Sequence, residues 1–549
     1  MSANIISETL IDYVSDAYKR LYGAGLQTID ECKNKVSYVY GGNAEHSGLV
    51  IGSERNKNGE LVIHKTAGLT HTLVCSSTGL GKTQGFILNN LFCANPNQSY
   101  VIADVKGELL EQTYYHFCET HGEQNVHIFN FRQPKNSTCY FNPFAEVAEK
   151  MLQAEKASSS VVKSRIRSEA LTDLSKLINT FFVVTDSKEP SWQESAKMLI
   201  EGIFLGLIED AVLGKIETRE VTLGAVINVF SNFVWDADDW GDNGFFSKRS
   251  KYSLARRKAQ TILSTTAKGT RTSYLSLVSL YLQAYNQPKI LEIMRRNNFD
   301  FSFFQERPQV VFVVYDLTND STKEIVNVFF ENMLTKLCGI YNKSLRPLNY
   351  PVLFFLDEFD SLKPKTIYPN LLSTGRGMGI FLQIVVQSLA QIKSSYGEKW
   401  SVITENCNLK IFLGTNNYET ARDFSNECGE TVVLSKNYLR RGEFFEEKEN
   451  VVSVEKILFE MQRGGALVKM IHMPAMSSLF AFAYKTPEYN QTTKFNPLSI
   501  MNEEIKVEEE IGGEIEVEMD SAQVKKAREA LELRKREILK RLEQQVKDE

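Results

Sequence analysis

The sequence predicts an α/β fold in which a mostly parallel sheet is flanked by helices and interrupted by an inserted all-α domain. Short apolar segments alternate with helical patterns before residue 145 and again after residue 300, as in parallel strands joined by crossover helices. Between these regions the apolar periodicity is helical, and strand patterns almost disappear. We therefore expect one sheet domain, built from two separated parts of the chain, with a helical domain between them.

Length and composition indicate a soluble protein of two or three domains. The chain has 549 residues, of which 43% are hydrophobic and 24% charged. Its net charge of −5 gives no global sign of nucleic-acid binding, so any such surface must be a local patch. The eight cysteines include no Cys-x-x-Cys pair, which favours reduced thiols in a cytosolic protein over a zinc site or a disulfide framework.

Membrane-spanning segments and a signal peptide are not expected. The longest apolar runs, such as 202–208 and 310–315, are far shorter than the roughly 20 residues that a spanning helix needs. The first 20 residues carry charges among their apolar positions, unlike a signal peptide.

Composition and periodicity together place the domain boundaries. The sheet domain is expected over 48–145 and 301–490, and the all-α domain over 146–300. A helical segment, 1–47, should precede them, and an acidic linker with a charged tail, 491–549, should follow.

Both ends of the chain have patterns of their own. Residues 4–22 look like an amphipathic helix. The strongly acidic stretch 503–520 is expected to be disordered. Residues 521–549, rich in Lys, Arg, Glu, Leu and Ala, could form a helix that is solvated or bound to a partner, or an unstructured solubilising tail.

The individual elements follow from short apolar runs and their turn signals. Helical patterns cover 84–91 and 323–341. Expected strands cover 48–51, 61–63, 72–75, 100–104, 126–130, 309–317, 352–356, 380–386, 410–413, 431–434 and 466–470.

The stretch His71-Thr-Leu-Val-Cys-Ser-Ser-Thr-Gly-Leu-Gly-Lys-Thr83 is a candidate phosphate-binding loop. A strand, a loop of small residues, Gly-Lys-Thr and a helix follow one another, so backbone N–H groups at a helix N-terminus could hold phosphates. Lys82 would reach the β- and γ-phosphates of ATP, and the Thr83 hydroxyl would bind Mg²⁺. The alternative is an ordinary strand-to-helix turn. The loop residues around the nucleotide would be Ser76, Ser77, Thr78, Gly79, Leu80 and Gly81.

A second motif, Asp357-Glu358, ends the apolar segment 352–356. ATP hydrolysis needs a carboxylate for the Mg²⁺ shell, and Asp357 fits that role. It also needs a group that orients or deprotonates water, and Glu358 fits that one. Both must stand at the carboxyl end of a strand beside the phosphate loop, where open α/β sheets bind ligands. The alternative is a plain surface turn.

Arg376 and Gln387 complete the candidate set. Arg376 lies in the glycine-flanked turn Gly375-Arg-Gly-Met-Gly379, where it could act in trans as an arginine finger or simply be a surface residue. Gln387 ends the strand 380–386 and could sense the γ-phosphate, position water or merely cap the strand.

In combination, these motifs resemble the TraG-type coupling proteins of type IV secretion and conjugation, which are grouped with FtsK-like and RecA-like hexameric DNA translocases. The resemblance covers about 48–482. It implies a RecA-like P-loop domain, a ring of six subunits with ATP sites between neighbours, and DNA in the central channel. It also implies the roles described above for the loop, Asp357, Glu358, Arg376 and Gln387. The motifs are 71–83, Asp104-Val-Lys-Gly-Glu108, Phe141-Asn-Pro-Phe144, Leu356-Asp-Glu-Phe359, Gly375-Arg-Gly-Met-Gly379 and Val386-Gln-Ser-Leu-Ala-Gln391.

The chain departs from that family in two ways. Ser76 stands where the first glycine of the loop would be, although this position varies in the family. Members usually begin with membrane-spanning helices, and none is expected here. We therefore expect a cytoplasmic protein, recruited peripherally to the membrane by a separate membrane-anchor protein that docks on the helix 4–22. The alternative docking surface is the C-terminal helix, which could instead hold the relaxase.

The all-α insertion resembles the family domain that caps the ring on its cytoplasmic side. A basic stretch within it could face DNA phosphates, or it could be a solvated helix face. Its candidate DNA-binding residues are Lys248, Arg249, Lys251, Arg256, Arg257 and Lys258.

The sequence therefore predicts an ATP-driven DNA translocase that brings a relaxase–DNA complex to a secretion channel. One alternative is an ATPase that moves or unfolds protein. The other is a non-hydrolysing adaptor that binds relaxase and channel proteins and uses nucleotide as a structural ligand. The Asp357-Glu358 pair speaks against the adaptor.

Overall fold

The structure is a computed structural model of the chain. It describes residues 26–28, 39–41, 47–183, 190–234, 240–264, 267–318, 320–362, 367–436, 444–461, 463–489 and 494–496. The expected helix 4–22, the acidic stretch 503–520 and the tail 521–549 lie outside these residues.

Among the described residues, ten strands form a central sheet in the order β1-β15-β14-β11-β5-β10-β9-β6-β8-β7. From β11 to β7 all neighbours are parallel, whereas β14 runs antiparallel to both β11 and β15. The strands are β1 (Gln27–Thr28), β5 (Thr72–Cys75), β6 (Ser99–Asp104), β7 (Val126–Asn130), β8 (Val310–Val314), β9 (Val352–Leu356), β10 (Ile380–Val386), β11 (Leu409–Phe412), β14 (Gly465–Met470) and β15 (Met476–Leu479). The predicted mostly parallel sheet is confirmed.

Helices cover both faces of the sheet. Successive side chains of a strand point to opposite faces, so an apolar strand places apolar side chains on both faces, and both must be buried. Val74 of β5 belongs to the apolar cluster under η1, α3 and α4, while Leu73 and Cys75 belong to the cluster under α13 and α14. The helices of this domain are η1 (Lys82–Ile87), which is a π-helical turn, α3 (Leu88–Phe92), α4 (Glu108–His121), α13 (Asp320–Ser344), α14 (Ile367–Met378), α15 (Leu389–Tyr396), α16 (Trp400–Asn406) and α17 (Tyr418–Cys428).

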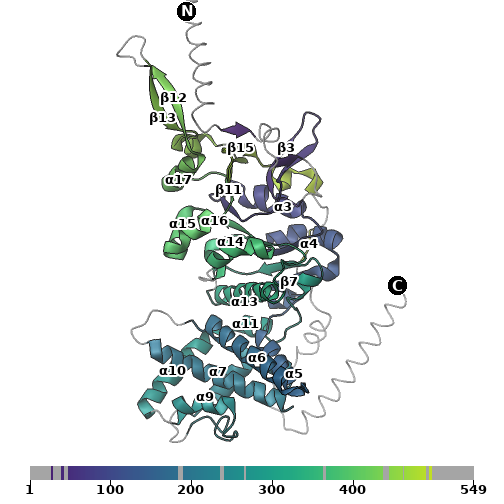
Figure 1. The fold of residues 1–549 in the computed structure, drawn as a ribbon, viewed down its shortest axis with the longest axis vertical. Coiled ribbons are helices and arrows are strands. Elements are labelled where there is room, and N and C mark those ends of the chain that lie inside the picture. Colours follow the sequence, from purple (N-terminus) through teal and green to yellow (C-terminus); the bar gives the residue numbers. More distant parts are fainter. Residues whose placement is uncertain are drawn as a thin grey trace, which may run out of the picture.

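The predicted all-α insertion lies between β7 and β8 and forms a separate bundle below the sheet in Figure 1. Its middle helix α7 is apolar on most sides, as a helix surrounded by others must be, and buries Leu199, Ile203 and Phe204. The helices are α5 (Pro143–Lys156), α6 (Ser160–Phe181), α7 (Pro190–Val212), α8 (Leu223–Ser231), α9 (Leu254–Leu263), α10 (Lys268–Tyr285), α11 (Pro288–Ile293) and α12 (Phe303–Glu306).

Aromatic side chains join the insertion to the sheet domain. Phe329 of α13 packs against Phe129 of β7 at 4.7 Å between ring centroids, and against Phe141, which leads into the insertion, at 5.1 Å. Three residues further along, Phe144 stacks on Phe204 inside the bundle at 3.9 Å. The Phe-Asn-Pro-Phe motif therefore has one ring in each domain, which fixes where the bundle begins.

Two smaller sheets lie outside the central one. One contains β2 (Val39–Gly41), β4 (Leu61–Thr66) and β3 (Val50–Arg55), and the other is the hairpin of β12 (Glu430–Lys436) and β13 (Phe444–Asn450). Strand β13 was not predicted, because four of its seven residues are charged and carry no apolar alternation. Strand β15 was also missed, since its sequence Met-Ser-Ser-Leu is short and half polar.

Within the described residues, the structure has no helix both long enough and apolar enough to cross a membrane.

Candidate nucleotide-binding site

The loop after β5 is held in place by both strands that flank β5. The backbone N–H of Ser76 donates to the carbonyl of Val386 at the end of β10 (3.0 Å). The N–H of Ser77 donates to the carbonyl of Gly414 after β11 (3.0 Å). The loop thus starts at a defined position at the carboxyl edge of the parallel sheet, where ligands bind in open α/β folds.

Two glycines give the loop its shape. Gly79 (φ 83°) and Gly81 (φ 112°) adopt the left-handed conformation that L-residues with a side chain rarely adopt. At Gly81, a Cβ would also collide with the ring of Phe482. Gly81 precedes Lys82, the first residue of η1, and the helix continues through α3 to Phe92. A close approach of loop backbone and a helix N-terminus is the environment that phosphate groups require.

Lys82 forms an ion pair with Glu358 across the sheet edge, and its ammonium lies 3.9 Å from Oδ1 of Asp357. All three side chains are largely shielded, with 11%, 16% and 13% of their surface exposed for Lys82, Glu358 and Asp357. Partial burial strengthens the attraction because solvent screens it less. The predicted loop and the predicted Asp-Glu pair therefore meet, although they are 276 residues apart in the chain.

Glu358 is held in a conformation unusual for its residue type. Its φ of 50° and ψ of 49° are left-handed, which costs of order 1–2 kcal/mol for a residue with a side chain. Both carboxylate oxygens of Glu358 accept hydrogen bonds from Nε2 of Gln387, each at 3.0 Å. The Thr78 hydroxyl donates to Oε1 of Gln387 at 3.3 Å. A chain of contacts therefore links the phosphate loop, the end of β10 and the end of β9. The Gln387 side chain bridges these three segments.

Burial raises the pKa of Asp357 to about 6, and the neighbouring Glu358 adds to this shift, while Lys82 opposes it. A divalent cation bound here would oppose the rise in the pKa of Asp357, since it stabilises the ionised carboxylate. Asp357, together with the hydroxyl of Thr83 in the first turn of η1, fits the oxygen ligands that Mg²⁺ prefers.

A third acidic residue at this edge, Asp104, belongs to one of the sequence motifs but not to the predicted site residues. It ends β6, is 1% exposed, and accepts backbone N–H groups of Gly107 and Leu110, each at 2.8 Å. Burial raises its pKa to about 7, although these two hydrogen bonds oppose the shift, and the charges of Glu108 and Asp357 add to it. Asp104 therefore anchors the start of α4 beside Asp357. The sequence signal that could have identified Asp104 is an acidic residue at the end of an apolar strand, the same signal that pointed to Asp357.

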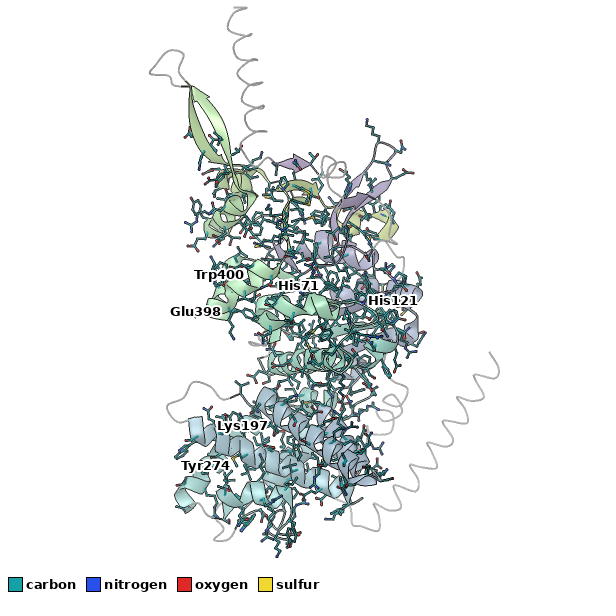
Figure 2. All side chains as sticks on the ribbon, in the orientation of Figure 1. His71, His121, Lys197, Tyr274, Glu398 and Trp400 are labelled. Carbon is teal, nitrogen blue, oxygen red and sulfur yellow. The ribbon has the colours of Figure 1, made fainter. Side chains whose placement is uncertain are left out.

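Arg376 lies at the opposite edge of the sheet. It is exposed near the C-terminus of α14, before β10 begins, and makes no ion pair with any residue that the structure describes. Its charge, after the larger effect of burial, helps to lower the pKa of His71 to about 4. His71 directly precedes β5 (Figure 2), and its Nδ1 accepts the N–H of Leu382 in β10. Because β5 and β10 are parallel, their amino ends lie far from the phosphate loop, so Arg376 does not reach the loop of its own chain.

Comparison with known proteins identifies the family. The model of the family "Type IV secretory system Conjugative DNA transfer" matches residues 24–463, most of the chain. This chain belongs to that family. The Escherichia coli conjugal transfer protein TraG is 24% identical over 416 residues, covering 72% of this chain and 61% of that protein. Protein VirD4 of Agrobacterium fabrum is 23% identical over 371 residues, covering 67% of this chain and 50% of VirD4. The chain thus spans about half to two thirds of the length of these relatives.

Solved structures of the conjugative coupling protein TrwB share the fold. The trigonal form in complex with sulphate aligns with a TM-score of 0.59 and 16% identity, over 87% of this chain and 96% of that one. The TrwB complex with ADP and Mg²⁺ aligns with a TM-score of 0.56 and 16% identity, over 85% and 96%. This similarity shows that the family's α/β domain with its helical domain is present here.

Some residues of the basic stretch predicted to contact DNA make ion pairs and hydrogen bonds within the all-α domain instead. The Arg249 guanidinium pairs with Asp210 (2.5 Å) and Lys258 pairs with Glu201 (2.7 Å). Arg256 donates to the carbonyls of Ser247 and Arg249. The exposed members are Lys248, Lys251 and Arg257. A DNA contact of this stretch remains a prediction, and these three can make it without breaking an ion pair or hydrogen bond described here.

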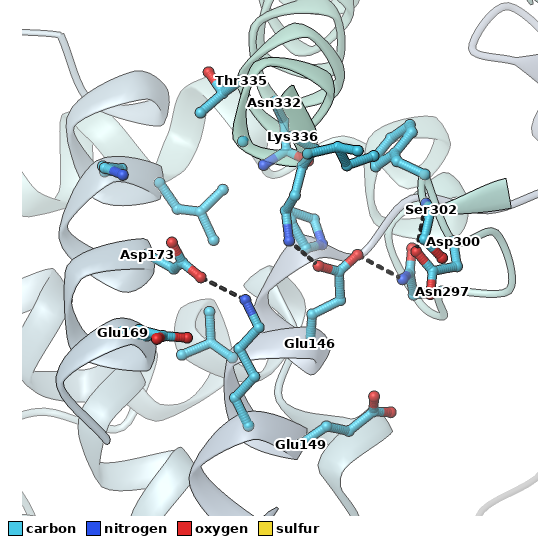
Figure 3. Close-up of a pocket in the computed structure, with 18 of the residues that line it drawn as sticks. Glu146, Glu149, Glu169, Asp173, Asn297, Asp300, Ser302, Asn332, Thr335 and Lys336 are labelled. Carbon is cyan, nitrogen blue, oxygen red and sulfur yellow. Dashed lines mark hydrogen bonds and ion pairs between the residues drawn. The ribbon is translucent and has the colours of Figure 1, made fainter. Parts of the chain in front are cut away.

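A large cleft of about 830 Å³ lies away from the phosphate loop, between α5, α6 and α13 (Figure 3). Its charges are of both signs, and some of them are paired: Lys150 binds Asp173 at 2.6 Å, and Glu146 binds both Lys336 and Asn297. This cleft lies at the interface between the all-α bundle and the sheet domain, and none of the predicted site residues lines it.

Asp104 gives the site a testable pH dependence. Its pKa is about 7 in the folded protein against an ordinary value of 3.8, so the folded state retains a proton that the unfolded chain releases between these values. Stability should therefore fall as pH rises from about 4 to 7, by at most about 1.4 kcal/mol per pH unit from this group. Asp104→Asn should flatten that part of the profile, measured as the free energy of unfolding in denaturant. Glu398→Gln, at an exposed carboxylate, is the control (Figure 2). Parallel profiles for Asp104→Asn and the wild type would contradict the assignment.

Proposed function

We propose that this protein is an ATP-driven coupling ATPase that brings DNA to a type IV secretion channel. The observation that carries the proposal is the cluster of Lys82, Asp357, Glu358 and Gln387 at one edge of the sheet. Membership of the conjugative DNA transfer family supports the DNA substrate. TrwB, which has the same fold, has been solved with ADP and Mg²⁺ and with an ATP analogue, and this supports Mg-ATP as the ligand.

The residues of the site divide the work of hydrolysis. Mg-ATP supplies the phosphoanhydride bond that is cleaved. Loop N–H groups and Lys82 would hold the phosphates, and Thr83 and Asp357 would hold the metal. Glu358 would orient and deprotonate the attacking water, while Gln387 keeps the Glu358 carboxylate aligned.

The ion pair between Lys82 and Glu358 suggests how binding is coupled to catalysis. While they are paired, Lys82 is not free to contact phosphate and Glu358 is not free to contact water. A triphosphate carries more negative charge than one carboxylate and would draw Lys82 away. Glu358 would then keep only Gln387 as a partner and become available as a base. The proposal therefore predicts a general base that is released only when the phosphate site is filled.

The position of Arg376 supports a ring of subunits. Since Arg376 lies at the edge opposite its own phosphate loop, it can serve only the nucleotide of a neighbouring chain. We propose a homohexamer with ATP sites between neighbours and DNA in the central channel. A relaxase and other channel proteins are the proposed partners. Because the channel crosses a membrane, peripheral recruitment to its cytoplasmic face, through a separate membrane-anchor protein, belongs to the same proposal.

The second candidate is an ATPase that moves protein rather than DNA. It is favoured by one observation, namely that three of the six candidate DNA-binding residues make internal ion pairs or hydrogen bonds. Stimulation of ATP hydrolysis by single- or double-stranded DNA distinguishes the two candidates. The non-hydrolysing adaptor is disfavoured because Glu358 and Gln387 are both present and connected to the loop.

Variants of the two central residues should separate binding from turnover. Lys82→Ala should weaken ATP binding, because the cation at the phosphates is lost. Glu358→Gln should bind ATP as the wild type does but turn over about 10²-fold more slowly or worse. Equilibrium binding and phosphate release measure the two effects. Wild-type turnover in Glu358→Gln would exclude Glu358 as the base.

Action of Arg376 in trans can be tested by mixing subunits. Arg376→Ala should lower turnover by about 10³-fold, as loss of an arginine finger does. Adding inactive Lys82→Ala protein should restore part of the activity, because mixed interfaces combine an intact Arg376 with an intact Lys82. Turnover per subunit is measured against protein concentration. Normal turnover in Arg376→Ala alone would remove the finger from the mechanism.

DNA binding by the basic stretch should be electrostatic and local. The logarithm of affinity should fall linearly with the logarithm of salt concentration. Replacing the exposed Lys248, Lys251 and Arg257 by Ala should reduce that slope by about two to three, at about 0.9 per phosphate contact. The matched control replaces three exposed lysines elsewhere, namely Lys57, Lys399 and Lys456. An equal slope in both triple variants would show that the stretch only faces solvent.

A further inference from the structure

A segment after β15 crosses the phosphate loop from the side opposite the catalytic carboxylates. The carbonyl of Ala481 accepts Nδ2 of Asn89 in α3 (2.8 Å), and the N–H of Tyr484 donates to Oε1 of Gln84 (3.2 Å). Gln84 is the second residue after Lys82. This segment, residues 480–485, is therefore fixed to the same helical turn that begins with the phosphate-binding lysine.

Two aromatic rings of this segment form a stack beside the loop. The ring of Phe482 lies against Gly81, where no side chain would fit, and is 7% exposed. The ring of Tyr484 lies parallel to it, with 10° between the planes and 5.8 Å between centroids. Tyr484 is 48% exposed, so part of its ring remains open to a ligand.

Two cationic side chains lie near the same rings. The Arg463 guanidinium is 5.2 Å from the centroid of Phe482, and the Lys485 ammonium is 5.6 Å from that of Tyr484. Both cationic residues are exposed. A half-open aromatic ring with positive charge around it suits a flat, electron-rich group attached to an anion.

The order of the sheet places this stack on one side of the loop and the carboxylates on the other. Lys82 pairs with Glu358, which follows β9, and Glu358 in turn accepts a hydrogen bond from Gln387, which follows β10. The aromatic segment follows β15, on the far side of β5 and β11. A nucleotide whose terminal phosphate meets Lys82 and Glu358 must extend its other end away from β9. That direction leads to Gln84 and Tyr484.

We propose that Tyr484, supported from behind by Phe482, is the platform on which the base of the bound nucleoside triphosphate stacks. This inference rests on the proposed function, since it assigns the second half of the same site. The contact is stacking, which accepts any base, so Tyr484 contributes affinity for nucleosides over bare phosphates. Phe482 also has a structural role, because its buried ring packs on Gly81.

The test compares a ligand with a base and a ligand without one. Wild-type protein, Tyr484→Ala and Tyr484→Phe are titrated with Mg-ATP and with magnesium tripolyphosphate, and both dissociation constants are measured by calorimetry. The control is Tyr252→Ala, at an exposed tyrosine of the all-α domain that also has a lysine, Lys251, over its ring. Tyr484 is targeted rather than Phe482 because its loss leaves the loop contact intact.

Tyr484→Ala should weaken ATP binding about tenfold, the loss expected for one base–aromatic stack. Tripolyphosphate binding should be unchanged, and Tyr484→Phe should bind both ligands as the wild type does. Unchanged ATP affinity in Tyr484→Ala would overturn the proposal. An equal loss for both ligands would also overturn it, since Tyr484 would then shape the loop rather than bind the base. Wild-type protein that binds neither ligand would overturn the proposed function, and this inference with it.

Discussion

The ion pair between Lys82 and Glu358 is the contact on which the rest of the site depends. It forms only if β5 and β9 end at the same edge, with β10 between them. It also requires Glu358 to hold a left-handed backbone conformation, which the two hydrogen bonds from Gln387 help to stabilise. Strained backbone that the surroundings keep in place is typical of functional sites. The parallel sheet therefore keeps Glu358 in a backbone conformation that is unfavourable by itself.

The position of the all-α insertion explains why it does not interrupt the parallel sheet. The chain leaves the sheet after β7 and returns at β8, and these two strands are parallel neighbours in register from Val126 with Val310 onward. The sheet order places β7 at the end of the sheet, away from β5. Phe329 packs against rings at the start of the bundle, so the junction has its own apolar core.

The two edges of the sheet have different chemistry. The carboxyl edge gathers Lys82, three buried or shielded carboxylates and an aromatic stack, whereas the amino edge presents the exposed Arg376 beside the neutral His71. The low pKa of His71 keeps a second positive charge away from Arg376 near neutral pH. In the proposed hexamer, the exposed Arg376 of one subunit would face the carboxyl edge of the next, as in a head-to-tail ring of identical subunits.

The sequence by itself determined the elements whose signal is local. Apolar runs ended by polar residues predicted β6, β7, β9 and β10 closely, and Gly-Lys-Thr with Asp357-Glu358 pointed to the candidate site through residue type and spacing alone. Only the tertiary structure decided what depends on distant partners. It paired Arg249 and Lys258 with acidic residues, raised the pKa of Asp104 by burial, and brought Phe482 onto Gly81. Periodicity records which side of an element is apolar, but the pairing of charges and rings between separated segments follows from packing.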